Sequence, residues 1–360
     1  MNMTDDEFAV VFIDSFEYLE YYKKRKILFE LYASPKDIFK DNRPIRQYFS
    51  SIGKENEGEK IISVIKDQRM ICDFVRRSVE GADGVIIFGS EDYPEELNQV
   101  PVPPLALYYK GNKDLLYGEK FAIVGSRRTL RSYEIKTEEI AQTLAESGVT
   151  IVSGIAEGGD AAALKGASRY KKAISVFAGG LDCVYPSINA RLIENMSENC
   201  LILSEKPCKT PPRKFYFPVR NRIIAGLGKG VLAVSGNAKS GVRYTLDYAL
   251  GCGKDVCCFP YGLGEIGGLC KEYVKKGAFM VESAEEIAEI MGYKLIDHKK
   301  ASLDDAEKIV YELVRKGAVD SDEIAEECDL SVSEIISALT KLEMKRLIVK
   351  EVDASYHAIK

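Results

Sequence analysis

The sequence has only two histidines, His298 and His357, so catalysis or metal binding by clustered histidines is disfavoured. It also lacks an apolar run of about eighteen residues, the length that a membrane-spanning helix needs. The first residues include Asp5, Asp6 and Glu7 in place of a basic segment followed by an apolar one. We therefore expect a cytoplasmic protein with no membrane span and no secretory signal.

Paired cysteine motifs are missing as well. The chain has nine cysteines, an odd number, and none are spaced as C-x-x-C, which favours reduced thiols over a disulfide framework. Cys257 and Cys258 are adjacent in a strand-like run, where neighbouring side chains point to opposite faces of a sheet. The two thiols cannot both face one metal ion, so we expect them to pack in the core and expect no metal site.

The common nucleotide-binding fingerprints are absent. No Gly-Lys is followed by Ser or Thr, which excludes a Walker A loop, and the turn at Gly125-Ser126-Arg127 does not fit G-x-G-x-x-G. An ATPase or a dinucleotide-dependent enzyme is therefore disfavoured. We expect no cofactor.

Two glycine-containing turns, one predicted helix apart, organise the middle of the chain. Residues 121–127 and 150–160 each begin with a short β-branched or aromatic run, typical of a buried parallel strand, and end in a turn toward a helix. Strands and helices keep alternating to about residue 290. The pattern predicts an α/β fold, with an extended Rossmann-like parallel sheet covered on both faces over residues 81–295.

The two ends of the chain predict separate domains. Residues 1–80 have a mixed polar and apolar helical pattern, which indicates a small helical domain. Residues 302–360 predict three helices and a hairpin, the arrangement of a winged helix. This segment has fourteen acids and eight bases, a net charge of −6, which would repel a phosphate backbone. We therefore favour a protein-contact role for it over DNA reading.

The predicted strands deliver their carboxyl ends to one edge of the sheet, where helix N-termini favour anions. A bare phosphate could be held there by hydroxyls, one arginine and backbone N–H groups. The groups that could hold it are Ser126, Ser153, Arg127 and the amides around Gly154, Gly158 and Gly179. The alternative is that these glycines only permit tight turns.

A cationic segment without any acid runs from Lys206 to Lys229, with three aromatic residues, 215–217, in its middle. Positive charge interleaved with rings on which bases can stack is typical of single-stranded nucleic-acid binding. The alternative is a solvated loop with an aromatic anchor packed into the core. The basic residues of the segment are Lys206, Lys209, Arg213, Lys214, Arg220, Arg222 and Lys229.

Several short motifs follow one another between residues 92 and 287, just over half of the chain. They are Asp92-Tyr93-Pro94, Val124-Gly125-Ser126-Arg127, Ser153-Gly154-Ile155-Ala156, Gly180-Leu181-Asp182, Val184-Tyr185-Pro186, Leu203-Ser204-Glu205, Thr210-Pro211-Pro212-Arg213 and the run from Phe217 to Leu227. In number and order these motifs resemble the DNA-processing protein A (DprA/Smf) family.

The resemblance implies a core that binds single-stranded DNA, forms homodimers and helps to load a RecA-type recombinase on incoming strands during natural transformation. It also implies a helical, SAM-like N-terminal domain, a C-terminal winged helix, and no nuclease or ATPase activity. By motif, Arg127 would bind phosphate, and Arg220, Asn221 and Arg222 would line the nearby groove. The full set of expected DNA- or phosphate-binding residues is Ser126, Arg127, Ser153, Gly154, Gly158, Gly179, Gly180, Arg213, Lys214, Phe217, Arg220, Asn221, Arg222, Ser240 and Gly241.

Four residues depart from the family's usual pattern. Glu157 stands where the family usually has a basic residue, Gly159 where it has isoleucine, Leu164 where it has histidine, and Ser235 where it has glutamate. A carboxylate at position 157 would weaken phosphate binding unless it turns to solvent or pairs with Arg127.

Two other readings stay open at this point. Thr245-Leu246-Asp247 loosely resembles the helix start of nucleotide phosphoribohydrolases, which share this kind of sheet, although their fuller P-G-G-x-G-T signature is absent. In that case Asp247 would be a catalytic acid. In the third reading the chain is a protein-interaction scaffold whose basic segment is incidental.

Overall fold

The computed structural model describes residues 3–237, 239–261, 267–296, 303–317, 320–345, 347–350 and 355–358. The chain divides into two compact units, Met1–Leu295 and Ile296–Lys360, and each unit is described by itself. Within the described residues, no helix has both the length and the apolar character that a bilayer crossing requires.

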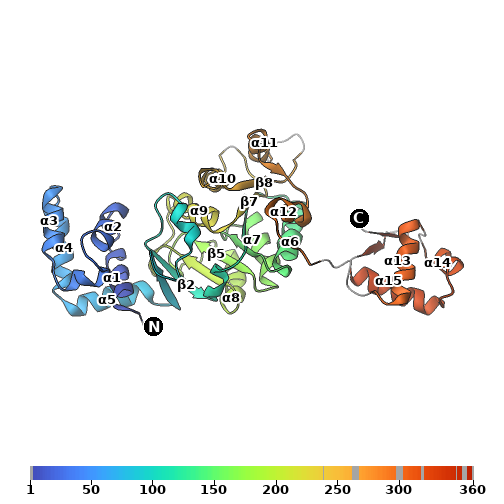
Figure 1. The fold of residues 1–360 in the computed structure, drawn as a ribbon, viewed down its shortest axis with the longest axis horizontal. Helices are drawn as coiled ribbons and strands as arrows, with labels where there is room; N and C mark the ends of the chain where they lie inside the picture. The colour runs from blue at the N-terminus through green and yellow to red at the C-terminus, as the bar shows by residue number, and fades with distance from the viewer. Residues whose placement is uncertain are drawn as a thin grey trace. The chain divides into compact units, whose positions relative to one another are not determined.

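The first unit begins with a bundle of helices (Figure 1). Thr4 starts the first of them with a capping box, because its side chain accepts the Glu7 amide and the Glu7 carboxylate accepts the Thr4 amide. Asp67 caps the last in the same region. The helices are α1 (Asp5–Asp14), α2 (Tyr21–Phe29), α3 (Arg43–Ser51), α4 (Glu55–Ile65) and α5 (Gln68–Val79), with the 3₁₀ helix η1 (Pro35–Phe39) between α2 and α3.

A nine-stranded sheet follows, in the order β1-β2-β6-β5-β4-β3-β7-β8-β9. The strands from β6 to β9 are parallel, whereas β2 pairs with both β1 and β6 in the antiparallel sense. The predicted α/β class with a large parallel sheet is therefore confirmed. The strands are β1 (Gly84–Ile87), β2 (Ala106–Gly111), β3 (Lys120–Val124), β4 (Thr150–Ser153), β5 (Ala173–Phe177), β6 (Leu201–Ser204), β7 (Gly230–Ala233), β8 (Asp255–Cys258) and β9 (Phe279–Met280).

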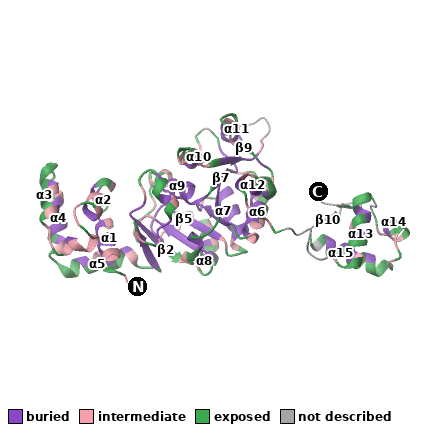
Figure 2. Cartoon of the chain, viewed as in Figure 1, coloured by how far each residue is buried: buried purple, intermediate pink, exposed green. Residues whose placement is uncertain are grey.

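Helices cover both faces of the sheet, and its central strands, β3 to β7, are buried (Figure 2). Alternate side chains of β3 show why: Phe121 and Ile123 join the core that contains α6, α7, α8 and α12, whereas Ala122 and Val124 join the core that contains α9, α10 and α11. The helices are α6 (Arg131–Glu146), α7 (Gly159–Ser168), α8 (Ala190–Ser197), α9 (Tyr216–Leu227), α10 (Val242–Gly251), α11 (Gly268–Lys275) and α12 (Ala284–Met291).

The N-terminal bundle packs on the sheet within the same compact unit. Its buried side chains form one continuous core with those of the first sheet face. The Tyr108 hydroxyl of β2 lies 3.1 Å from Asp14 Oδ2, and the Cys208 amide donates to the Ser78 carbonyl at 2.8 Å. The bundle therefore stands beside the loop that follows β6.

All nine cysteines are free thiols, as predicted, and all lie within the described residues. Cys257 and Cys258 belong to the two different cores, so their side chains point to opposite faces of β8. Burial raises the pKa of the Cys257 thiol to about 12, which keeps it protonated and unreactive.

The second unit contains α13 (Asp305–Lys316), α14 (Ser321–Glu327), α15 (Val332–Met344) and the antiparallel pair β10 (Ile348–Lys350) and β11 (Tyr356–Ala358). Side chains of Asp304, Asp320 and Ser331 cap the three helices. This unit buries a core of its own. Three helices followed by a hairpin confirm the predicted winged helix.

Candidate nucleic-acid interface

A hollow of about 290 Å³ opens where β3 and β7 end and where α9 and α10 begin. We call it the strand-end hollow. It brings together seven of the predicted site residues: Ser126, Arg127, Phe217, Arg220, Asn221, Ser240 and Gly241. A narrower hollow of about 20 Å³ adjoins it, shares Arg127, Phe217 and Arg220, and adds Gly179 and Tyr185.

Cations and rings alternate along these two hollows. The Arg127 guanidinium is exposed and lies 5.9 Å from the centre of the Tyr185 ring. Tyr185 meets Phe217 edge to face with ring centres 6.0 Å apart, and the Arg220 guanidinium lies 6.0 Å from the Phe217 ring. Tyr185 is 45% exposed, so one ring remains open to a stacking partner. This is the combination that binds phosphates and unstacked bases.

Arg220 forms the floor of the strand-end hollow. It is buried, its Nη1 donates to the Val176 carbonyl, and its Nε donates to Asn221 Oδ1 at 3.1 Å. Burial lowers the pKa of Arg220, and the charge of Asp160 opposes that shift. Asn221 in turn donates to the Gly241 carbonyl at 3.2 Å, which ties α9 to the start of α10. Arg127 is therefore the exposed cation of the site, and Arg220 is the buried one, held by hydrogen bonds.

An internal carboxylate already binds one backbone amide in each of the two glycine turns. Asp160 accepts the Gly125 N–H at 3.0 Å and the Ala156 N–H at 3.3 Å. Burial raises the pKa of Asp160, while these hydrogen bonds and the charges of Arg220 and Arg127 act in the opposite direction. The Gly125 and Ala156 amides are therefore already satisfied within the protein.

Ser235 stabilises the first turn. Its Oγ lies 3.0 Å from the Ser126 amide, 3.0 Å from Ser126 Oγ and 2.6 Å from Thr129 Oγ1. This hydroxyl cluster links the end of β3 to the end of β7 where the family usually has a glutamate. The Ser126 amide is taken, but its hydroxyl still lines the strand-end hollow.

Four predicted residues have structural roles in place of ligand contacts. The buried Ser153 hydroxyl donates to the Ile123 carbonyl at 2.6 Å, so its prediction as a phosphate ligand is wrong. A Cβ on Gly154 would lie 2.4 Å from Asp160 Oδ2, and one on Gly158, where φ is +79°, would lie 2.5 Å from the Ser126 carbonyl. Gly180 donates its amide to Thr210 at 2.8 Å. The tight-turn alternative accounts for these glycines.

Arg222 is not among the described residues that line the strand-end hollow, so the prediction that it shares one groove with Arg220 is wrong. Its two terminal nitrogens pair with the Glu205 carboxylate inside the protein, and its Nε donates to the Val102 carbonyl at 2.8 Å. Arg220 and Arg222 are two positions apart on α9, so they project from different sides of the helix. Burial alone would raise the pKa of Glu205, but the charge and hydrogen bonds of Arg222 outweigh it and hold that pKa below its ordinary value.

Arg213 and Lys214 are exposed, and neither is among the described residues that line the strand-end hollow. Arg213 approaches Glu17 of the helical bundle at 3.5 Å. Their loop, which precedes α9, faces the bundle. Its direction is set by packing between elements far apart in the sequence.

Sequence reasoning missed Tyr185, Asp160 and Glu205 as residues of the site and its support. Tyr185 belongs to a motif that carries the family resemblance, which was the available signal.

Of the departures, Glu157 is exposed, and the described lining of the strand-end hollow does not include it. Asp247 is also exposed and accepts a hydrogen bond from the Tyr273 hydroxyl on α11, away from the glycine turns. Across the described residues, no group of three or more His, Cys, Asp or Glu side chains is arranged to hold a metal ion.

Comparisons with known proteins agree on one family. The model described as DNA recombination-mediator protein A matches residues 84–292, and the one described as DprA winged helix domain matches residues 297–352. The chain is 39% identical to the DNA processing protein DprA of Streptococcus pneumoniae over 199 residues, 54% of this chain and 70% of that protein. It is 34% identical to Protein Smf of Escherichia coli over 242 residues, 64% of this chain and 65% of that protein.

Two solved structures are similar in fold. The X-ray structure of DNA processing protein A from Streptococcus pneumoniae has a TM-score of 0.62 and 27% identity, and covers 82% of this chain and 99% of that chain. DNA processing protein A from Helicobacter pylori has a TM-score of 0.54 and 29% identity, and covers 58% of this chain and 97% of that chain. The report on the Helicobacter protein describes its single-stranded DNA binding mode.

Proposed function

The chain belongs to the DNA recombination-mediator protein A family, and from this premise we propose that it binds single-stranded DNA at the strand-end hollow. The observation that carries the proposal is the row of Arg127, Tyr185, Phe217 and Arg220 along adjoining hollows. Arg127 would hold a phosphate, the rings would stack bases, and Arg220 would supply fixed positive charge beneath them. A duplex has neither unstacked bases nor the flexibility to enter so narrow a site.

In this role the protein acts without catalysis. It would cover incoming single strands and load a RecA-type recombinase on them during natural transformation. The acidic winged helix would contact a protein partner, because its net charge of −6 opposes binding to phosphate. Asp247 does not support a phosphoribohydrolase activity. It accepts a hydrogen bond from Tyr273, and it is not among the described residues that line the strand-end hollow.

A salt series with single- and double-stranded oligonucleotides of equal length tests this proposal. We expect the single strand to bind more tightly, and the logarithm of its affinity to fall linearly with the logarithm of salt concentration. The slope is about 0.7 per phosphate contact. Negligible single-strand affinity at low salt, or a preference for the duplex, would contradict the proposal.

The open edge of the sheet supports the proposed homodimer. Strand β9 ends the strand order among the described residues, and its two side chains, Phe279 and Met280, are 44% and 63% exposed. Exposed apolar residues on an edge strand favour pairing with a second copy. We expect the wild type to be a dimer by light scattering and Met280→Asp to be a monomer. Met70→Asp, the same change at another exposed methionine, should remain dimeric. A monomeric wild type, or equal behaviour of both variants, would rule out this interface.

A further inference from the structure

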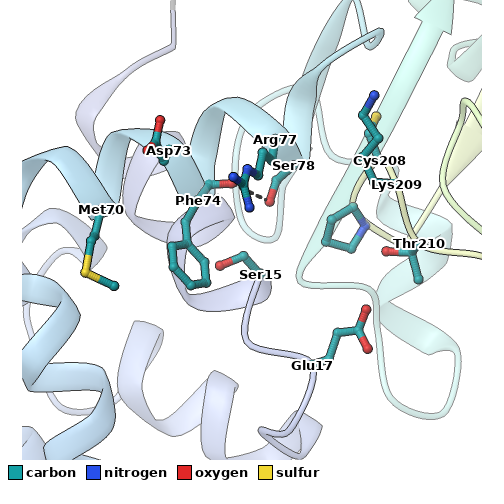
Figure 3. A pocket seen from close by; sticks show the side chains of 11 residues that line it. Ser15, Glu17, Met70, Asp73, Phe74, Arg77, Ser78, Cys208, Lys209 and Thr210 are labelled. Carbon is teal, nitrogen blue, oxygen red and sulfur yellow. Dashed lines mark hydrogen bonds between the residues drawn. The ribbon is translucent and has the colours of Figure 1, made fainter.

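In the acid-free segment from Lys206 to Lys229, the residues that line the strand-end hollow begin at Phe217. Most residues of its earlier part, 206–216, line a different depression, formed by hollows of about 350 and 280 Å³ that share Glu17, Pro207 and Thr210. We call this depression the bundle groove, because its opposite wall is the N-terminal helical bundle. Figure 3 shows one part of it, with Arg77 and Ser78 of α5 across from Lys209 and Thr210.

The wall formed by the loop repeats the chemistry of the strand-end hollow. Lys206 Nζ lies 4.8 Å from the centre of the Tyr216 ring, and the Arg213 guanidinium lies 6.0 Å from the same ring. Phe215 packs edge to face on Tyr216 at 4.5 Å and is 59% exposed. The exposed Phe215 ring, packed on a second ring that two cations approach, is a good platform for an unstacked base.

The bundle wall carries both charges, and most of them are already paired. Lys24 bonds to Asp14 at 3.0 Å, and deeper in the groove Arg222 pairs with Glu205. Asp73 pairs with Arg76 at 2.9 Å. The remaining acid, Glu17, is 52% exposed on its side chain and stands 3.5 Å from Arg213. An exposed pair of this kind contributes little, about 0–1 kcal/mol, so a phosphate can take the place of Glu17 beside Arg213.

The two sites are joined through consecutive residues. Phe217 lines the strand-end hollow, whereas Tyr216 and Phe215 line the bundle groove. We propose that the bundle groove is a second binding segment for single-stranded nucleic acid. A strand leaving Arg127 and Phe217 continues over Phe215 and between the loop and the bundle. This inference rests on the proposed function and extends its footprint onto the N-terminal helices.

Removing the acid at position 17 gives a test that misfolding cannot imitate, because the expected effect is tighter binding. We expect Glu17→Gln to bind an oligonucleotide of about twenty nucleotides about two- to fivefold more tightly, since one repulsive charge is removed. An oligonucleotide of about three nucleotides, too short to reach past the strand-end hollow, should bind as before. Glu289→Gln, an exposed acid on α12, is the matched control and should change neither affinity.

A second variant tests the opposite direction. Lys206→Ala combined with Phe215→Ala should weaken binding of the long oligonucleotide about tenfold and leave the short one unchanged, because a stacking ring and a phosphate contact are lost. The inference would be overturned if Glu17→Gln left the affinity for the long oligonucleotide unchanged. It would also be overturned if either variant changed the affinities for the long and the short oligonucleotide equally. If Arg127-dependent binding is absent at every length, the proposed function itself fails. If that binding persists and the groove variants are neutral, only the extended footprint fails.

Discussion

Arg127→Ala is expected to weaken single-stranded DNA binding about tenfold to a hundredfold. Arg127 is the exposed cation of the strand-end hollow, and it approaches the Tyr185 ring. Among the described residues, no carboxylate forms an ion pair with it. A charge-assisted contact with phosphate contributes about 1.5–3 kcal/mol, and each 1.4 kcal/mol is about a factor of ten in affinity. Fluorescence anisotropy at a fixed, moderate salt concentration measures the change.

The neighbouring residue provides the control for this prediction. Arg128 is also exposed, has the same charge, and is not among the described residues that line the strand-end hollow. Arg128→Ala should therefore lose little affinity, and only Arg127→Ala should reduce the salt slope by about 0.7. Equal losses in the two variants would mean that the protein attracts DNA by its overall field and not by this site.

Arg222→Ala is expected to lower the free energy of unfolding by about 3–5 kcal/mol, because it leaves the Glu205 carboxylate, whose side chain is only 16% exposed, without its cation. The variant also loses the donors to the Pro101 and Val102 carbonyls. Urea unfolding measures the loss. Arg213→Ala, which removes an exposed pair with Glu17 and a distant contact with the Tyr216 ring, should change the same quantity by well under about 1 kcal/mol. Comparable stability of the two variants would contradict the structural role assigned to Arg222.

The pH dependence of this loss has a definite sign. Arg222 holds the pKa of Glu205 below its ordinary value of 4.5 in the folded protein, so the pair stabilises the fold above that pH and loses its contribution as the pH falls. Without Arg222, burial would raise that pKa. Protonation of Glu205 would then remove the cost of its unpaired charge in the variant. The difference in stability between wild type and Arg222→Ala should therefore begin to shrink at the raised pKa of the variant, above pH 4.5, and continue to shrink as the pH falls below 4.5. A difference that grows in acid would exclude Glu205 as the partner.

Much of the site could be predicted because topology alone brings it together. Strands β3 and β7 are neighbours in a parallel sheet, so the turns after them, with Ser126, Arg127 and Ser240, meet at one edge. Phe217 and Arg220 belong to the first half of α9, which lines the same hollow. The strand and helix periods in the sequence were strong enough to predict the sheet and the winged helix.

The errors have two physical origins. A helix separates residues two positions apart, so Arg220 and Arg222 could not both face one groove; this could have been seen from the predicted helix itself. The partners Glu205 and Asp160 could not, because a buried ion pair and an internal carboxylate on backbone amides depend on contacts between distant segments. The direction of loop 206–216 likewise depends on where the N-terminal bundle packs.

The central claim is that an unpaired strand lies against Arg127, Tyr185 and Phe217. Photo-cross-linking of a single-stranded oligonucleotide that carries 4-thiothymidine, followed by mass spectrometry of the peptides, tests this contact directly. The account predicts adducts on the peptides that contain Tyr185 and Phe217, and their loss in Arg127→Ala. Adducts confined to the winged-helix residues, or unchanged in that variant, would contradict it.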